Sequence, residues 1–196
     1  MSVSLDGFVA GPVQSPDDPV GAGGLRLHDW HWHADEPGHE ASVKPRDWLM
    51  ARRDAVIMGR KMFGPVRGEW DENWRGWWGE EPPYHAPVYV LTHYAREPIT
   101  MKGGTTFHFV TDGFSAALEL ARAAAGADGE IDIAGGASTV RQALAADVMD
   151  EIVLDIVPVL LGRGERLLDG VDDPGLTAIE AVHTPYATHV RYRVGS

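Results

Sequence analysis

Short apolar runs that stop at glycine, proline or a charged residue set the pattern of hydrophobic and polar positions along this chain. Runs of this kind, bounded by turn-forming residues, are typical of buried β-strands. A first strand begins at Ser2 and ends in a turn at Asp6-Gly7, because an Asp-Gly pair favours a turn. The other predicted strands are 55–58, 87–91, 106–110, 130–134, 151–161, 176–183 and 188–194.

Segments with a helical spacing of apolar residues lie between several of these strands. The strongest of them has Asp112 or Ser115 as a candidate N-cap, and Gly126 would end it. Helices alternate with strands as far as residue 150, and strands alone follow. The predicted helices are 41–53, 114–125 and 138–145.

This order of elements predicts an α/β fold with a central, mostly parallel sheet and antiparallel C-terminal strands. Pro158 lies within the run 151–161 and cannot donate to a strand ladder, so an edge, a bend or a bulge is expected there. Neither an internal repeat nor a low-complexity segment divides the sequence. We therefore expect a single domain over residues 1–196.

The chain of 196 residues carries a formal net charge of −12. This charge disfavours nucleic acid as a partner, because binding along a phosphate backbone needs a basic surface. No apolar run approaches the ~20 residues of a membrane span, so we expect no membrane contact, and no secretory leader pattern is present. Cysteine is absent, which excludes disulfides and fits a cytoplasmic protein. The first strand has little sequence before it, as it would if a start codon had been assigned too late.

Two glycine-marked turns, in 56–64 and 131–139, carry the candidate chemistry. In each, an apolar run stops at glycine and helix-like sequence follows. Such a turn binds phosphate because backbone N–H groups point at the anion and the absent side chains let it approach. Arg60, Lys61 and Arg141 would supply positive charge nearby. Two such turns predict a ligand with more than one phosphate, such as a dinucleotide; turn geometry alone is the alternative.

Residues 11–40 are rich in Gly, Pro, Asp and His and have no clear period, as functional loops often do. Their histidines and carboxylates could form a metal site, but the spacing matches no zinc pattern, and we expect no metal. A lid over the substrate is favoured, with Trp30 or Trp32 stacking on a flat ring. The second irregular stretch, 65–86, holds tryptophans that either pack in the core or a dimer contact, or form an aromatic wall for a ligand. These are Trp70, Trp74, Trp77 and Trp78.

Five short segments occur in order over nearly the whole chain. They are Ser4-Leu5-Asp6-Gly7-Phe8-Val9-Ala10-Gly11, Met58-Gly59-Arg60-Lys61-Met62-Phe63, Val90-Leu91-Thr92-His93, Ala134-Gly135-Gly136-Ala137-Ser138-Thr139 and Val157-Pro158-Val159-Leu160-Leu161-Gly162-Arg163-Gly164. Together they resemble the dihydrofolate reductase-like superfamily. The likeness is closest to the reductase domain of bacterial riboflavin-biosynthesis deaminase-reductases and its stand-alone relatives. The resemblance implies a three-layer α/β fold, with NADPH lying across the C-terminal ends of the parallel strands.

The resemblance also implies which residues contact the adenosine side of the cofactor. Thr92 and His93 match the segment that holds the 2′-phosphate and adenine, and the nearby Arg96 also favours NADPH over NADH. A second group matches the segment that meets the pyrophosphate and the adenosine side. Its members are Gly59, Arg60, Lys61 and Met62.

Further matches lie around the second glycine turn and near the start of the chain. Gly135 and Gly136 match a pair that often has a cis peptide bond in this superfamily. Val9 and Ala10 match positions near the nicotinamide. Donors to phosphate would come from the residues that follow the glycine pair. They are Ala137, Ser138 and Thr139.

On the substrate side, the resemblance makes Asp6 the leading polar residue, as a substrate contact or proton relay; a plain turn residue is the alternative. Folate reductases place one acid on the helix after the first long loop, and no single acid of this chain matches it. The resemblance implies an NADPH-dependent reductase that transfers hydride to a small pteridine-, pyrimidine- or folate-like heterocycle. A nucleotide-binding module without turnover and a metal-dependent hydrolase using the histidine loop stay open as alternatives. The likeness also implies a homodimer, with a contact near residues 153–161.

Overall fold

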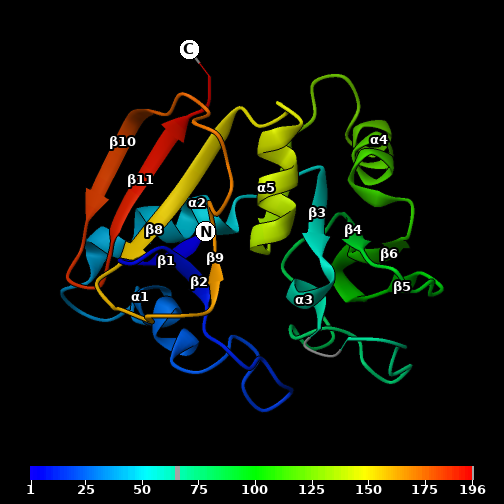
Figure 1. The fold of residues 1–196 in the computed structure, drawn as a ribbon, viewed down its shortest axis with the longest axis horizontal. Coiled ribbons are helices and arrows are strands. Elements are labelled where there is room, and N and C mark those ends of the chain that lie inside the picture. The colour runs from blue at the N-terminus through cyan, green and yellow to red at the C-terminus, as the bar shows by residue number, and fades with distance from the viewer. Residues whose placement is uncertain (65–66, 196) are drawn as a thin grey trace. The chain divides into compact units, whose positions relative to one another are not determined.

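The structure is a computed structural model that describes residues 1–64 and 67–195 (Figure 1). The chain folds into two compact units. Unit 1 contains Met1–Ala51 and Ala143–Ser196, and unit 2 contains Arg52–Gln142. Unit 1 is therefore assembled from both ends of the sequence. A single domain over 1–196 stays a prediction, because this division does not test whether either unit folds alone.

Unit 2 is built on a five-stranded sheet in the order β5-β6-β4-β3-β7. Four of its strands are parallel, and the short β5 runs antiparallel at one edge. The strands predicted at 55–58, 87–91, 106–110 and 130–134 are confirmed, with ends that differ by at most one residue. The five strands are β3 (Ala55–Gly59), β4 (Pro87–Leu91), β5 (Ile99–Thr100), β6 (Thr106–Val110) and β7 (Ile131–Gly135).

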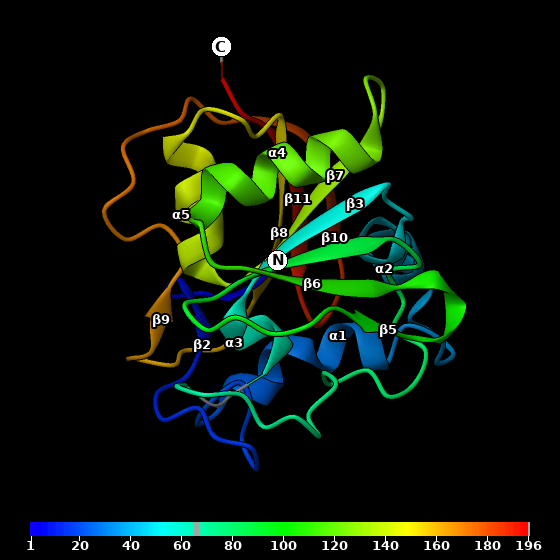
Figure 2. The ribbon, with the colours of Figure 1, turned by 90° about the vertical axis from the view of Figure 1, so that its right-hand side faces the viewer.

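Helices and a long loop cover this sheet. Helix α4 (Gly113–Ala125) packs against β3 and β4, and its Ala117 and Ala121 are completely buried. Helix α3 (Arg60–Phe63) follows β3 directly and lies on the other side of the sheet from α4 (Figure 2). A short 3₁₀ helix, η3 (Lys102–Gly104), joins β5 to β6, and α5 (Ala137–Ala145) begins after β7.

The ends of α4 test the predicted capping residues. Gly126 ends the helix as predicted, with φ 80°, a conformation that glycine adopts at no steric cost. Of the two N-cap candidates, Asp112 is the N-cap residue, but no side chain caps the helix. Asp112 occupies the N-cap position with φ −90° and ψ 14° and makes no capping hydrogen bond, and Ser115 lies inside the helix. A capping side chain normally needs an extended backbone at the N-cap, which Asp112 lacks.

The core of unit 2 gathers alternate residues from neighbouring strands together with Phe63. Trp70, Trp74 and Trp78 pack against this cluster, and Trp77 meets Trp74 edge-on with ring centroids 4.5 Å apart. These contacts support core packing of the tryptophan-rich stretch; a contact with a ligand or a dimer partner stays a prediction. The buried strand residues of the cluster are Val56, Met58, Val88, Val90, Ile99 and Phe107.

Unit 1 contains a four-stranded sheet in the order β1-β8-β11-β10. Strands β8, β11 and β10 are antiparallel, and β1 pairs with β8 in parallel. Two short strands, β2 (Phe8–Ala10) and β9 (Glu165–Arg166), form a separate antiparallel pair. The sheet strands are β1 (Ser2–Ser4), β8 (Glu151–Val157), β10 (Thr177–His183) and β11 (Thr188–Arg193). The predicted C-terminal strands are confirmed, except that the one predicted at 151–161 ends at Val157, directly before Pro158.

Residues 11–40, predicted to be irregular, contain two short helices of unit 1. They are η1 (Gly24–His28) and α1 (Asp29–Trp32). They form because Leu27 and Trp30 are completely buried, packing with Val157, Val159 and Ala187 in the core of this unit. The helix predicted at 41–53 is confirmed in shorter form: η2 (Glu40–Ser42) leads into α2 (Val43–Met50).

The fold class is confirmed as α/β, with a central, mostly parallel sheet and antiparallel C-terminal strands. The antiparallel strands form a sheet of their own instead of extending the parallel one. Within the part of the chain that the structure describes, no helix has the length and apolar character needed to cross a membrane.

Candidate functional site

In unit 2, neighbouring strands end at the residues expected to hold the cofactor. Strand β3 lies between β4 and β7, and all three are parallel. Gly59 pairs with Leu91 of β4, and Met58 pairs with Gly135 of β7. The two glycine turns, distant in sequence, therefore meet at the C-terminal edge of the sheet, where open α/β sheets bind ligands.

Glycine is required at position 59 because the Thr139 side chain lies close to its Cα, and not because of its backbone conformation. Its φ of −78° is open to any residue. A Cβ atom at this position, however, would lie 2.8 Å from Thr139 Oγ1. Thr139 is buried at the start of α5, and its N–H bonds to the Gly136 carbonyl at 2.9 Å. The missing side chain of Gly59 is thus what lets the second glycine turn pack on the first.

The second turn has the backbone that the resemblance implies. The Gly135–Gly136 peptide bond is cis, and Gly135 has φ 123°. A Cβ atom at Gly136 would meet no other atom within 4 Å, so the space beside this residue is open. Ala137 and Ser138 then begin α5, and the first N–H groups of a helix have no partner within the helix. This arrangement could hold a phosphate group.

Arg60 lies at the same edge of unit 2 and is held by an aromatic side chain. Its guanidinium carbon lies 3.6 Å from the ring centroid of Trp70 and 5.2 Å from that of Tyr94. Its Nη1 donates to Thr92 Oγ1 at 3.3 Å. Burial lowers the pKa of Arg60, and the nearby Arg96 acts in the same direction. A group with an ordinary pKa above 12 stays charged, so this edge carries a fixed positive charge.

Arg96 is a second cation, and its Nε lies 3.5 Å from the Glu72 carboxylate, with which it forms an ion pair. Its side chain is only 4% exposed, and its guanidinium carbon lies 5.5 Å from the Trp70 ring. Nη2 donates to the Glu72 carbonyl at 2.8 Å. Nη1 is buried and has no hydrogen-bond partner among the described residues. His93, the other residue expected to meet a 2′-phosphate, is exposed.

In unit 1, the carboxylate of Asp6 is fully engaged by its neighbours. Oδ1 accepts hydrogen bonds from the Ser4 hydroxyl at 2.6 Å and from the Leu161 N–H at 3.1 Å. Oδ2 accepts one from the Gly162 N–H at 2.7 Å. The Ser4 hydroxyl and these N–H groups lower the pKa of Asp6 to about 2. Three hydrogen bonds therefore hold this carboxylate in place, and its role as a substrate contact or proton relay stays a prediction.

Val9 and Ala10, expected near the nicotinamide, belong to β2 and to a tightly packed piece of backbone. Gly164 lies so close that a Cβ atom there would be 2.0 Å from the Ala10 carbonyl oxygen. A Cβ atom at Gly11 would be 2.2 Å from the Ala22 carbonyl oxygen. Neighbouring backbone therefore approaches the Ala10–Gly11 segment from two loops.

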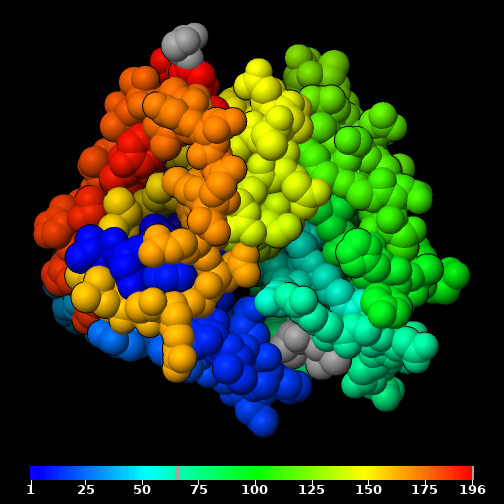
Figure 3. All heavy atoms as spheres, in the orientation of Figure 1, coloured from blue at the N-terminus to red at the C-terminus, as the bar shows by residue number. Residues whose placement is uncertain are grey.

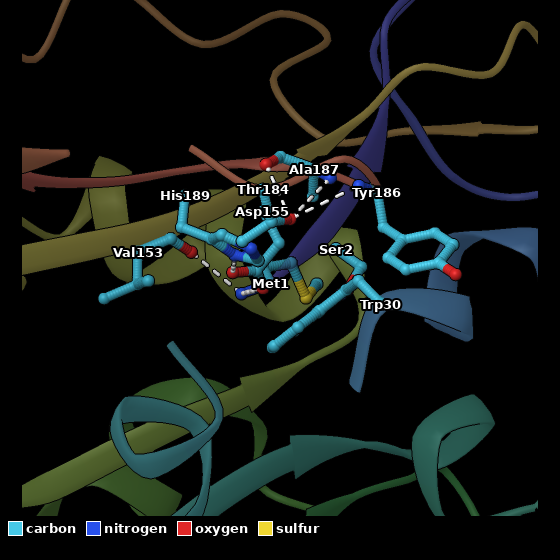
Figure 4. Close-up of polar contacts among 9 residues, drawn as sticks. All are labelled: Met1, Ser2, Trp30, Val153, Asp155, Thr184, Tyr186, Ala187 and His189. Carbon is cyan, nitrogen blue, oxygen red and sulfur yellow. Dashed lines mark hydrogen bonds and ion pairs between the residues drawn. The ribbon is translucent and has the colours of Figure 1, made fainter. Parts of the chain in front are cut away.

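The two tryptophans proposed to stack on a substrate lie in different environments. Trp30 is completely buried, and its Nε1 donates to Ser2 Oγ at 2.9 Å (Figure 4). Its ring meets His189 edge-on, with centroids 4.6 Å apart. Trp32, in contrast, is 55% exposed. Trp32 contacts the rings of His28 and His31 but keeps an exposed surface, whereas Trp30 is part of the core.

The histidines of the first loop do not assemble into a metal site. Nowhere in residues 1–64 and 67–195 do three histidine, aspartate or glutamate side chains form a group that could hold a metal ion. Burial and the neighbouring His31 lower the pKa of His28 to about 4. His33 and His39 instead stack on Tyr186, with ring centroids 5.2 and 5.0 Å from it.

The family model of the RibD C-terminal domain matches residues 1–190 of the chain. This chain belongs to the RibD C-terminal domain family. Family membership accounts for the order of the five segments and for the paired glycine turns. No protein of curated function matches the chain.

Solved structures agree with this RibD C-terminal domain assignment. A Shewanella sp. PV-4 protein, assigned provisionally to riboflavin biosynthesis, is 22% identical, with a TM-score of 0.61 over 99% of this chain and 96% of its own. A pyrimidine reductase-like protein from Corynebacterium diphtheriae is 15% identical, with a TM-score of 0.53 over 99% of this chain and 89% of its own. At these identities the likeness shows the fold alone.

A longer protein also contains this fold. It is a diaminohydroxyphosphoribosylaminopyrimidine deaminase/5-amino-6-(5-phosphoribosylamino)uracil reductase from Thermotoga maritima. It is 15% identical, with a TM-score of 0.55 over 98% of this chain. The present chain spans 54% of that protein, so about half of the longer enzyme has no counterpart here.

The sequence did not single out several residues that complete these arrangements. Trp70 was expected only as one of four tryptophans, and nothing in its spacing marks it as the partner of two arginines. Gly164 belongs to a family segment, but its closeness to Ala10 joins residues far apart in the chain. Serine is common in strands, and only the position of Ser4 two residues before Asp6 could have indicated that its hydroxyl donates to the Asp6 carboxylate.

Proposed function

We propose that this protein is an NADPH-dependent reductase that transfers hydride to a small pteridine-, pyrimidine- or folate-like heterocycle. The observation that carries the proposal is the meeting of Gly59 with Thr139 beside the open space at Gly136, in a chain of the RibD C-terminal domain family. The names of two structural relatives, one a uracil reductase and one pyrimidine reductase-like, agree with this reaction class.

The residues of unit 2 fit the phosphates of such a cofactor. Gly59 is the N-cap of α3, which contains Lys61 and Met62, and Ala137 with Ser138 begins the helix after the second turn. The N–H groups there suit a pyrophosphate, because they are preorganised and need no side chain. We assign these five residues to pyrophosphate binding.

A second charged group suits the 2′-phosphate that distinguishes NADPH from NADH. Arg60 is positioned by Trp70 and Thr92, and the buried Nη1 of Arg96 lacks a partner among the described residues. Guanidinium groups bind phosphate through several donors at once. We assign Arg60, Thr92, His93 and Arg96 to this end of the cofactor.

The bound nicotinamide supplies the hydride, and the chain supplies orientation and a dry surface. Val9 and Ala10 would contact the nicotinamide ring, and Trp32 would stack on the flat ring of the substrate. We further propose that the protein acts in the cytoplasm as a homodimer.

Cofactor binding is the first test. We expect saturable binding of NADPH with a Kd below about 1 mM, followed by nicotinamide or tryptophan fluorescence. NADH should bind about tenfold more weakly, because it lacks the group that Arg60 and Arg96 would bind. Arg96→Ala should remove this preference. No detectable binding at submillimolar NADPH would contradict the proposal.

A matched control separates the charge of Arg96 from general damage to unit 2. Arg75 also lies in the tryptophan-rich stretch, and its Nη2 donates to the Thr100 carbonyl at 3.2 Å. Arg75→Ala should leave the ratio of NADPH to NADH affinity unchanged. An equal loss of preference in both variants would argue against a specific role for Arg96.

One observation favours the alternative, a nucleotide-binding module without turnover. The carboxylate of Asp6, the expected catalytic residue, is engaged by Ser4, Leu161 and Gly162 and has a pKa of about 2. A reductase must then take its proton from water, substrate or another side chain. Substrate-dependent oxidation of bound NADPH, tested with pyrimidine and pteridine compounds, separates the two functions.

A further inference from the structure

The Asp6 carboxylate ties two loops of unit 1 together. Asp6 lies in the turn between β1 and β2, and the N–H groups of Leu161 and Gly162 bond to its two oxygens. Ser4 Oγ donates to the same carboxylate and accepts the N–H of Phe8 at 2.9 Å. Asp6 thus joins the beginning of the chain to residues about 155 positions later. Figure 3 shows these two segments, blue and gold to orange, side by side on one face of unit 1.

Backbone hydrogen bonds continue the same junction on both sides of Asp6. The Leu5 N–H donates to the Val159 carbonyl at 2.9 Å, and the Leu167 N–H donates to the Gly7 carbonyl at 3.0 Å. Strand β2 then pairs with β9. The loop from 159 to 167 is therefore held against the segment from 5 to 10 at both of its ends and, through Asp6, at Leu161 and Gly162.

At this junction the backbone of Gly164 contacts the backbone of Ala10. Gly164 follows the two residues that Asp6 binds, and its Cα lies against the Ala10 carbonyl with no room for a side chain. On the other side, a Cβ atom at Gly21 would lie 2.3 Å from the Gly11 carbonyl oxygen. The position of Ala10 and Gly11 depends on both loops.

We propose that Asp6 is a positioning residue, which sets the Val9–Ala10 backbone for the nicotinamide end of the cofactor by fixing the loop of Leu161, Gly162 and Gly164. This inference rests on the proposed function. It replaces the proton-relay role of Asp6 with one that acts through the loop. Asp6 serves as a charged acceptor for two N–H groups, and its hydrogen bonds are of the strong, charge-assisted kind.

The test compares two ligands that differ at one end. NADPH carries the nicotinamide, and 2′,5′-ADP carries only the adenosine phosphates. In Asp6→Ala, we expect the Kd for NADPH to rise roughly tenfold and the Kd for 2′,5′-ADP to stay within about twofold, both measured by titration calorimetry. The ratio of the two affinities is a readout that general destabilisation would not change selectively.

A second variant reaches the same backbone contact without touching Asp6. In Gly164→Ala, the new Cβ would lie 2.0 Å from the Ala10 carbonyl oxygen, and Gly164 already has φ 139°. The same selective loss of NADPH affinity is expected. Ser4→Ala removes one of the donors to Asp6 and should give a smaller loss of the same kind. If Asp6→Ala does not fold, Asp6→Asn serves in its place, since it keeps an acceptor for Leu161.

Asp173 provides a matched control in unit 1, because its Oδ1 also accepts a backbone N–H, that of Gly175, at 3.0 Å. Asp173→Ala should change neither affinity. Hydrogen exchange of wild-type and Asp6→Ala protein supplies a ligand-free readout: amides of 159–166 and 8–11 should exchange faster in the variant.

The outcomes separate this inference from the proposed function. If the wild-type protein does not bind NADPH, the proposed function fails and this inference falls with it. If the wild type binds NADPH but Asp6→Ala weakens both ligands equally, or neither, the inference alone is overturned. A proton relay instead predicts normal NADPH affinity in Asp6→Ala and a loss confined to turnover.

Discussion

Gly59 shows at the scale of a single residue why a glycine can be predicted more easily than its purpose. The sequence marks it as the end of a strand before helix-like residues. Turn geometry does not explain why this residue is glycine, because its φ of −78° is open to any residue. The contact with Thr139 Oγ1 explains it, and that contact joins residues 80 positions apart in unit 2.

The first residue-scale prediction follows from this contact. In Gly59→Ala the new Cβ would overlap Thr139 Oγ1, which should displace the second glycine turn and weaken NADPH binding about tenfold. Thr139→Ala removes the overlapping oxygen, so the double variant should bind NADPH more tightly than Gly59→Ala alone. Titration of the four proteins gives a double-mutant cycle, and strictly additive losses would contradict the predicted overlap.

Trp30 and Trp32 show, also at the scale of single residues, that the sequence does not predict which of two neighbouring tryptophans is buried. Both lie in one short aromatic segment, and the sequence offers no period by which to separate them. The structure does so because α1 is a single helical turn, in which residues two positions apart face different sides. Trp30 enters the core against His189, and Trp32 stays exposed.

At the scale of elements, β8 and β11 carry a buried pair of polar side chains directly opposite each other. Asp155 and His189 are register partners, and Asp155 Oδ1 lies 2.8 Å from His189 Nδ1 (Figure 4). Both side chains are almost fully buried. Burial disfavours the charged form of Asp155, but the amino group of Met1 and the hydrogen bond with His189 outweigh it and hold the pKa of Asp155 below its ordinary value.

We expect Asp155→Asn to lower the free energy of unfolding by about 2–4 kcal/mol near neutral pH, because it leaves buried polar groups without a charged partner. The pH dependence follows from the lowered pKa. The stabilisation is complete above the unfolded pKa of about 3.9 and is lost as the pH falls through the folded value. The difference between wild type and variant should therefore shrink in acid. Urea unfolding at several pH values measures it.

An exposed pair on the same strands provides the control. Arg191 of β11 donates to the Glu151 carboxylate of β8 at 2.6 Å, near the surface. Glu151→Gln should cost less than about 1 kcal/mol, since exposed ion pairs contribute little. A loss in Glu151→Gln equal to that in Asp155→Asn would show that burial is not the cause.

The elements themselves were largely predictable from sequence. Strands β3, β4, β6 and β7 and helix α4 were located to within one residue, because their apolar runs are short and bounded by turn-forming residues. The two-residue strand β5 was not predicted. Asp112, one of the two N-cap candidates, is the N-cap residue of α4, but the absence of a capping hydrogen bond follows from its backbone angles, which the sequence does not specify. The short helices η1 and α1 were missed because tertiary burial, and not local spacing, stabilises them.

At the scale of the whole molecule, the strands form separate sheets, whereas the sequence predicted one central sheet with antiparallel C-terminal strands. Strand β1 comes from the start of the chain and pairs with β8 from its last quarter. Local patterns do not specify such a long-range pairing. The compact units 1 and 2 are the consequence, and the domain organisation over 1–196 stays a prediction.

The homodimer belongs to this scale. We expect light scattering after size-exclusion chromatography to give twice the chain mass of 21.3 kDa. Strand β8 lies between β1 and β11, so its backbone is already paired on both sides. A contact involving residues 153–161 would therefore use side chains and the loop after Val157, and not strand pairing. A single species with the mass of one chain, measured at micromolar protein concentration, would contradict the proposed dimer.

The sequence by itself determined the order of strands and helices, the two glycine turns and the family, because these depend on local period and on short motifs. Tertiary structure alone decided that Thr139 packs on Gly59, that Asp6 holds the loop of Leu161 and Gly162, and that Trp30 is buried. The reason is physical: each of these contacts joins residues far apart in the chain, and the partner of a side chain is set by the folded backbone.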